Sequence, residues 1–130
     1  MTRRIRSGLT YAALALSCSL QAAPLPAPAR AEVDALLHRL QTSGCEFNRN
    51  GSWYSGTDAK AHLLKKLDDV EGKDRVSTAE QFIERGATGS SMSGKPYLVR
   101  CAVKAPVESA PWLKAELQLV RAAKAAPSPR

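Results

Sequence analysis

The side chains best suited to chemistry are gathered between positions 89 and 95, in the stretch GSSMSGK. Three hydroxyls and one amine lie there, from Ser90, Ser91, Ser93 and Lys95. Together with flexible backbone amides, they suit a polar or anionic ligand such as a carboxylate, a sugar or the end of a partner's chain. Serines also satisfy the backbone of ordinary turns, so a purely structural role for this loop is an equal alternative.

The glycines of this stretch also fit most of the phosphate-binding P-loop pattern, G-x-x-x-x-G-K-[ST]. The last position should be Ser or Thr to reach the magnesium ion, but it is Pro96. A P-loop joins a strand to a following helix, whereas here a predicted helix precedes the loop and a predicted strand follows it. No helix N-terminus would then face the phosphates. We therefore do not expect nucleotide binding.

A hydrolytic site is the main alternative to a binding site. One of the serines could act as a nucleophile with His62 as its base. No G-x-S-x-G motif surrounds any serine, however. We expect no metal ion or other cofactor, because the sequence has neither a C-x-x-C pair nor histidines at metal-ligand spacing.

Two of the three cysteines are predicted to form a disulfide. Cys18 lies in a segment that we expect to be removed, which leaves Cys45 and Cys101. Two cysteines in an oxidising compartment most simply form one bond. The alternative is a redox or metal pair, but these cysteines are far apart in the sequence and lack the usual spacing.

Residues 1–22 have the pattern of a secretory signal peptide. Three arginines precede an apolar run that is too short for a membrane span. We expect cleavage after Ala22 and export from the cytoplasm, with a lipid anchor on Cys18 as the alternative. Cleavage would lower the formal net charge of +7 by three. The basic composition is therefore not a sign of nucleic-acid binding.

Four helices are predicted from apolar residues that recur at helical spacing, with the ranges 31–42, 58–70, 78–86 and 110–122. Thr57 would cap the second helix. Ser77 and Glu80 have the spacing of a capping box before the third, and Gly86 would end it. Residues 23–30 should form an extended leader and residues 122–130 a disordered tail, so the folded domain is predicted to span 31–121.

A short sheet is predicted beside these helices. Asn50-Gly51 is a strong signal for a two-residue hairpin turn between strands 45–49 and 52–54, with Phe47 opposite Tyr54. A third strand, 97–103, would place its odd-numbered residues on one face. We thus predict a small single α+β domain, with about four helices packed on a short three-stranded antiparallel sheet and one disulfide.

Several stretches together resemble the YfeK-like family of short exported bacterial proteins of unknown function. The stretches are FNRNGSWY (47–54), AHLLKKL (61–67), STAEQFI (77–83), SSMSGKPYLVRC (90–101) and APWLKAEL (110–117). The resemblance implies a periplasmic location and a small α+β domain, and it supports the disulfide. It implies no catalytic residues, because the family has no established activity.

Elimination of the metal, nucleotide and triad patterns favours a non-enzymatic binding or interaction module. Its site is predicted where the Ser90–Lys95 loop meets the hairpin turn, with Arg49 as a second cation. The helical stripes and the sheet face use most of the apolar residues, so we expect little room for a deep pocket. The partner would be a periplasmic protein or a small polar or anionic ligand.

Overall fold

The computed structural model describes residues 12–15, 24–73 and 76–126. In these ranges the chain forms a small α+β domain, which confirms the predicted class, with a fourth strand beyond the three expected. The elements in order are α1 (Ala27–Thr42), β1 (Glu46–Arg49), β2 (Ser52–Tyr54), α2 (Gly56–Lys73), α3 (Ala79–Gly86), β3 (Leu98–Arg100), β4 (Val107–Glu108) and α4 (Ser109–Ala125). The predicted signal peptide and Cys18 lie outside the described residues, apart from positions 12–15, as do residues 127–130 of the predicted tail.

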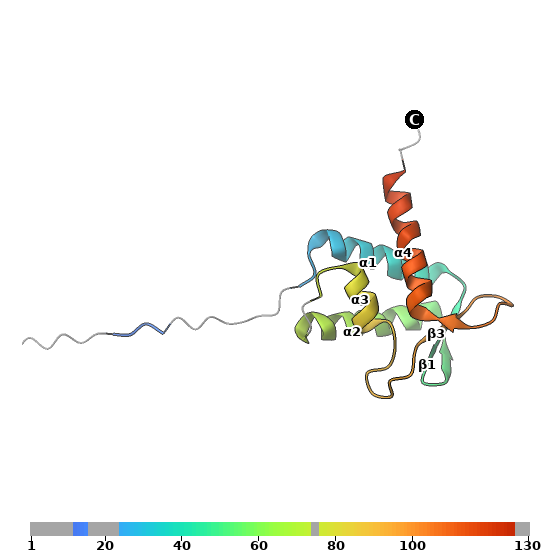
Figure 1. Ribbon diagram of the computed structural model, residues 1–130, viewed down its shortest axis with the longest axis horizontal. Coiled ribbons are helices and arrows are strands. Elements are labelled where there is room, and N and C mark those ends of the chain that lie inside the picture. The colour runs from blue at the N-terminus through green and yellow to red at the C-terminus, as the bar shows by residue number, and fades with distance from the viewer. Residues whose placement is uncertain (1–11, 16–23, 74–75, 127–130) are drawn as a thin grey trace, which may run out of the picture.

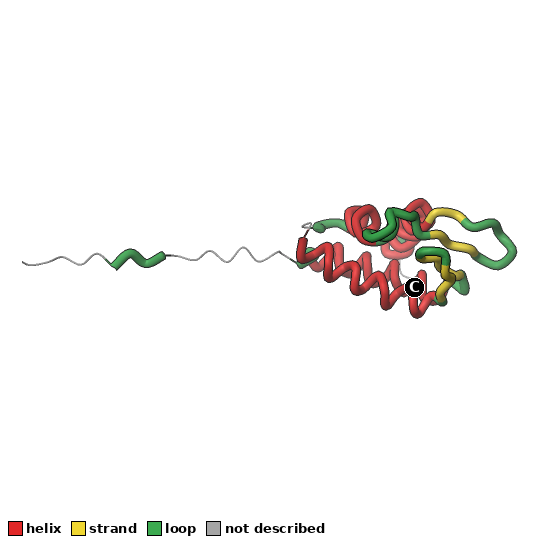
Figure 2. The backbone as a smooth tube through the Cα atoms, turned by 90° about the horizontal axis from the view of Figure 1, so that it is seen from below, coloured by secondary structure: helices red, strands yellow, loops and turns green. Residues whose placement is uncertain are grey.

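The four helices pack around one apolar core. Each helix turns a stripe inward because its apolar residues recur every three or four positions. The largest fully buried side chains are Leu36, Leu37, Leu40, Leu67, Phe82, Ile83, Leu113 and Leu117, with Val33 and Val99. The strands lie together at one end of this helical body (Figure 1), and the view from below shows the same arrangement (Figure 2).

The antiparallel sheet has the strand order β2-β1-β3-β4. The predicted hairpin is confirmed with its register, in which Phe47 pairs with Tyr54. Its turn residues Asn50 and Gly51 both have positive φ, at 52° and 87°, as a type I′ turn requires. Strand β1 also pairs with β3, where Phe47 lies opposite Val99.

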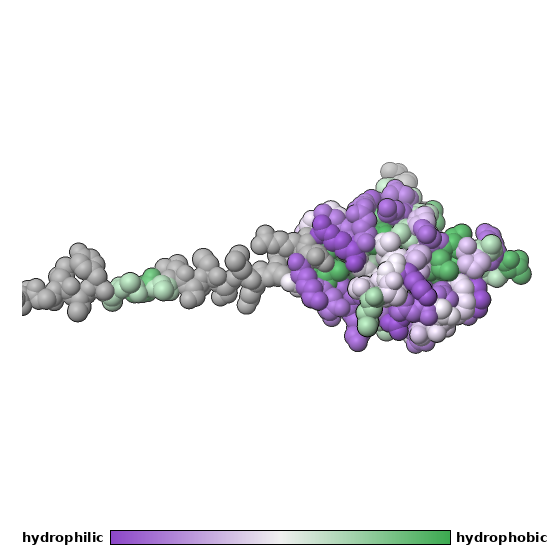
Figure 3. Space-filling view, turned by 60° about the horizontal axis from the view of Figure 1, so that its bottom comes forward, coloured by the Kyte–Doolittle hydropathy of each residue, from purple (hydrophilic) through white to green (hydrophobic). Residues whose placement is uncertain are grey.

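The third strand was predicted to reach Val103, which is wrong. Strand β3 ends at Arg100, and Ala102 takes a positive φ of 52° that leads the chain out of the sheet. The chain then returns as β4, which pairs with β3. Val103 is fully exposed on the intervening loop. This loop forms a hydrophobic tip on a mainly hydrophilic face (Figure 3).

Several helix ends differ from the predictions. Helix α1 begins at Ala27, inside the predicted leader, because Leu25 and Ala29 are buried against the domain. Helix α4 reaches Ala125, beyond the predicted start of the tail. The cap of α2 is the Ser55 hydroxyl rather than Thr57, since it accepts a hydrogen bond from the Asp58 N–H at 3.2 Å.

Helix α3 is capped by Thr78, so the predicted capping box of Ser77 and Glu80 is wrong. Thr78 accepts from the Gln81 N–H at 3.1 Å, and the Gln81 side chain accepts from the Ser77 N–H at 2.8 Å. Gly86 belongs to the helix instead of ending it. A Cβ at this position would lie 3.2 Å from the buried Phe82 ring, so the glycine serves close packing.

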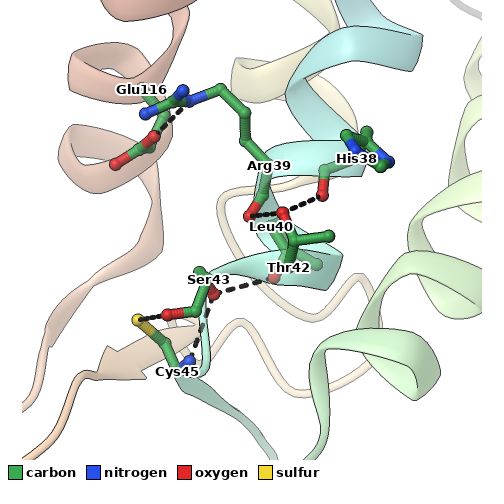
Figure 4. A network of polar contacts seen from close by, with 7 residues as sticks. All are labelled: His38, Arg39, Leu40, Thr42, Ser43, Cys45 and Glu116. Carbon is green, nitrogen blue, oxygen red and sulfur yellow. Dashed lines mark hydrogen bonds and ion pairs between the residues drawn. The ribbon is translucent and has the colours of Figure 1, made fainter.

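The end of α1 is fixed where it leads into the sheet, as Figure 4 shows. The Ser43 hydroxyl donates to the Leu40 carbonyl at 2.8 Å and accepts from the Cys45 N–H at 3.2 Å. Arg39 reaches across to Glu116 of α4 at 2.6 Å. Cys45 is bonded to Cys101, which confirms the predicted disulfide and joins the start of β1 to the residue after β3.

No helix among the described residues is long and apolar enough to cross a membrane.

Candidate functional site

A cavity of about 370 Å³ lies between the hairpin, α2 and the start of α4. Its inner walls are buried apolar side chains, among them Leu40, Phe47, Leu63 and Leu113. Its outer walls include Arg49, Tyr54, Asp58, His62 and Lys65. The expectation that little room would remain for a pocket is therefore wrong. The small side chains of Ala59 and Ala87 in the wall leave space that larger residues would fill.

Three polar side chains form a chain of contacts along the cavity. Arg49 Nη1 lies 2.6 Å from His62 Nδ1, and 3.5 Å from Nε2. His62 Nε2 lies 3.1 Å from the Tyr97 hydroxyl, and the two rings meet edge to face. The Arg49 guanidinium also lies 5.2 Å from the centre of the Tyr54 ring, within the range of a cation–π interaction.

These contacts favour one tautomer of the His62 imidazole. A guanidinium has only donors, so the closer contact of Arg49 with Nδ1 favours the tautomer in which Nδ1 carries no proton. The proton of the neutral ring is then on Nε2, which donates to the Tyr97 oxygen. The Tyr97 hydroxyl keeps its own proton, and no described residue accepts it. The chain of bonds therefore ends in a donor that is available at the cavity wall.

The electrostatics agree with this assignment. Burial lowers the pKa of His62, and the nearby cations Arg49, Lys66 and Lys65 lower it further. Burial raises the pKa of the Tyr97 hydroxyl, which favours its protonated form. Hydrogen bonding from Arg49 lowers the pKa of Tyr54. At neutral pH the cluster thus combines a cation, a neutral imidazole and a phenol.

Each of the three residues is placed by a different element. Arg49 follows Phe47 by two positions on β1, so strand alternation turns both to the cavity side. His62 precedes Leu63 of the buried stripe of α2. Tyr97 is held before β3 because its N–H donates to the Thr88 carbonyl at 2.9 Å and its own carbonyl accepts from the Ser109 N–H at 2.8 Å.

The predicted serine loop does meet the hairpin turn, but through Asn50 rather than Arg49. Ser93 donates to the Asn50 side chain at 2.6 Å, and Asn50 donates to Ser90 at 3.5 Å. Ser91 accepts from Lys66 of α2. None of the loop residues 90–95 is among the residues that line the cavity. The predicted site residues therefore fall into two groups, with Arg49 and His62 at the cavity and the serines outside it.

The serines mainly organise their own loop. The Ser90 oxygen accepts from the N–H groups of Met92 and Ser93, each at 3.3 Å. The Ser93 oxygen accepts from the Lys95 N–H, also at 3.3 Å. Lys95 is exposed and has no ion-pair partner among the described residues. In the described ranges, no group of three or more His, Cys, Asp or Glu side chains could hold a metal ion.

Comparison with known proteins gives the family. The sequence model of DUF5329, a family of unknown function, matches residues 27–121. The chain belongs to this family. The uncharacterized protein YfeK of Salmonella typhimurium is 38% identical over 91 residues, which are 68% of this chain and 74% of that protein. No solved structure matches.

The YfeK-like resemblance of the sequence is thereby confirmed. The segment matched by the DUF5329 model contains every residue of the cavity wall, from Leu40 to Leu113. The family description assigns no activity, so a role for this site has to come from its geometry.

Sequence reasoning missed Tyr97 as a site residue. The sequence placed Tyr97 only on one face of the third strand, and no sequence pattern shows that it meets His62. One signal was available for Arg49, since its spacing from Phe47 already placed both on one strand face.

Proposed function

We propose that this domain binds a small molecule in the cavity and does not transform it. The observation that carries the proposal is an apolar cavity of about 370 Å³ with three convergent polar groups in its wall. Ligand pockets commonly occupy roughly 300–1,000 Å³ and combine apolar walls with a few polar groups that orient the ligand. The cavity lies at the small end of that range, which suits a compact ligand.

The walls are held in place by contacts within the domain itself. The disulfide fixes β1 beside β3, and the Ser109 hydroxyl donates to the Ala87 carbonyl at 2.7 Å inside the domain. The guanidinium of Arg49 is held by His62. Such preorganisation supports a binding role because less freedom is lost when a ligand enters.

Binding without turnover is favoured over hydrolysis by the surroundings of His62. Its two ring nitrogens contact Arg49 and Tyr97, and no serine hydroxyl is among its described partners. A cation at the nitrogen that should accept a proton also makes this histidine a poor general base.

We propose a bracing role for the serine loop. Its bonds to Asn50 and Lys66 tie the hairpin turn to α2, and both of these elements contribute residues to the cavity wall. Exposed Lys95 is left as a point at which a protein partner could dock. As part of the same proposal, we place the protein in the periplasm after signal cleavage. The disulfide supports this location, because such bonds persist in oxidising compartments.

The binding proposal can be tested with a neutral apolar dye, N-phenyl-1-naphthylamine, whose fluorescence rises in an apolar site. The variant Ala61→Trp places a large ring at an exposed position of the cavity wall, so it should block entry without overpacking the core. Ala31→Trp, at an exposed position of α1 away from the cavity, is the matched control. We expect the parent and Ala31→Trp to bind the dye and Ala61→Trp to lose binding, with similar thermal unfolding for all three.

Equal dye binding by Ala61→Trp and the parent would contradict the proposal. Hydrolysis of a p-nitrophenyl ester by the purified protein, lost in His62→Ala, would replace it with the hydrolase hypothesis.

A further inference from the structure

Arg49 is a cation without an acidic partner among the described residues. Four other arginines each have a carboxylate oxygen within 3.1 Å, namely Arg30, Arg39, Arg100 and Arg121. Arg49 instead contacts a neutral imidazole and the face of a tyrosine, although it is partly buried. A partly buried cation is normally paired, because loss of hydration costs free energy that a counter-charge offsets.

The cavity wall as a whole is also positively charged. Arg49 and Lys65 supply two cations and Asp58 supplies one carboxylate, while His62 is neutral. Asp58 belongs to the first turn of α2, where the helix N-terminus stabilises a negative charge. The wall therefore carries a net positive charge beside an apolar interior.

Two hydrogen-bond donors of this wall, on Arg49 and Tyr97, both lie beside His62. Arg49 uses one N–H for His62 and has others available. The Tyr97 hydroxyl accepts from His62 and still has its own proton to donate. His62 contacts both residues, so it keeps the guanidinium and the hydroxyl as neighbours on one wall. A carboxylate could accept from Arg49 with one oxygen and from Tyr97 with the other.

From these observations we infer that the ligand is a small amphiphilic monocarboxylate. Its carboxylate binds Arg49 and Tyr97, and its apolar body lies against Leu40, Leu63 and Leu113. The inference rests on the proposed function, because it names the ligand class of the same cavity. A cation in the same place would be repelled, and a neutral molecule of the same shape would gain only the apolar contacts.

Isothermal titration calorimetry with ligands of one chain length tests the head group. Octanoate, 1-octanol, octylammonium and octyl phosphate are each titrated into the intact protein, and their dissociation constants are compared. We expect octanoate to bind at least tenfold more tightly than octanol, since a hydrogen bond to a charged group is worth that factor or more. Octylammonium should bind more weakly than octanol.

Two variants test whether Arg49 and Tyr97 cause the preference for a carboxylate. Arg49→Gln should weaken octanoate binding about tenfold and leave octanol unchanged, whereas Arg30→Gln, on the outer surface of α1, should alter neither. Tyr97→Phe removes only the hydroxyl, so it tests the same site if Arg49→Gln proves unstable. This variant should bind octanoate severalfold more weakly than the parent protein does.

Three outcomes would overturn the inference. If octanol binds as tightly as octanoate and Arg49→Gln changes neither, the cavity binds apolar molecules without a carboxylate, and the proposed function stands alone. Tighter binding of octyl phosphate than of octanoate would assign the site to phosphate esters. If neither octanoate nor octanol binds, the inference and the proposed function both fail.

Discussion

Removal of the Cys45–Cys101 disulfide should lower the free energy of unfolding by about 4 kcal/mol. The bond closes a loop with a sequence separation of 56 residues, and the chain-entropy relation gives about this value at 25 °C. This loss of about 4 kcal/mol is an upper limit, because residual structure in the unfolded chain reduces it. Small domains have a total stability of roughly 5–15 kcal/mol, so the loss is a large fraction of the whole.

Urea unfolding followed by circular dichroism measures this loss. The oxidised protein is compared with the double variant Cys45→Ala/Cys101→Ala and with the parent protein reduced by dithiothreitol. The reduced parent keeps both sulfur atoms in place, so it separates the effect of the bond from that of a smaller side chain at the buried Cys45. The denaturant slope should rise without the bond, because the unfolded chain then exposes more surface.

A loss below about 1 kcal/mol in both the reduced parent and the double variant would refute the chain-entropy reasoning. A large loss in the variant with a small loss in the reduced parent would assign the effect to packing at Cys45.

Two further predictions concern the cavity wall and a close helix contact. Because burial and Arg49 lower the pKa of His62, the unfolded state binds a proton more readily, so stability should fall as pH drops below about 6.5. Thermal unfolding from pH 7.5 to 4.5 should show this slope reduced in His62→Gln, with His38→Gln as the control for loss of a histidine on α1; an unchanged slope in His62→Gln would contradict the assignment. Gly86→Ala should destabilise the domain by about 1 kcal/mol, because the new Cβ would press on the buried Phe82 ring at 3.2 Å. Gly72→Ala, in α2 with open space around it, should instead stabilise by about 0.5 kcal/mol, and chemical denaturation giving the same sign for both would contradict the packing argument.

Local features of the sequence were sufficient to predict most of the helices and strands. Asn50-Gly51 specified the hairpin and its register because a two-residue turn allows few alternatives. The buried stripe of α1 at Val33, Leu36 and Leu37 follows directly from helical spacing. The pairing of the cysteines required only their number and the expected compartment.

The features that depend on distant parts of the chain were not predictable in the same way. Strand β4 has two residues after a proline, and only its pairing with β3 makes it a strand. The leader became part of α1 because Leu25 packs into the domain and its N–H meets Glu71 at 3.2 Å. The contact of Arg49, His62 and Tyr97 joins positions 49, 62 and 97 through tertiary packing, which no local pattern encodes.

The first and last helices, α1 and α4, also determine where the cavity would lie if one end of the domain were attached to something. Leu40 lies near the end of α1 and Leu113 near the start of α4, so the cavity is at the sheet end of both helices. The ion pair between Arg121 of α4 and Glu32 of α1, at 2.7 Å, joins the other halves of these helices. Each of these two residues lies roughly 12 Å along its helix from the cavity residue, at 1.5 Å per residue. The start of α1 and the end of α4 therefore lie away from the strands (Figure 1). An affinity tag, a fusion partner or a surface attached at either end would therefore lie at the opposite end of the domain from the cavity and would leave its wall uncovered.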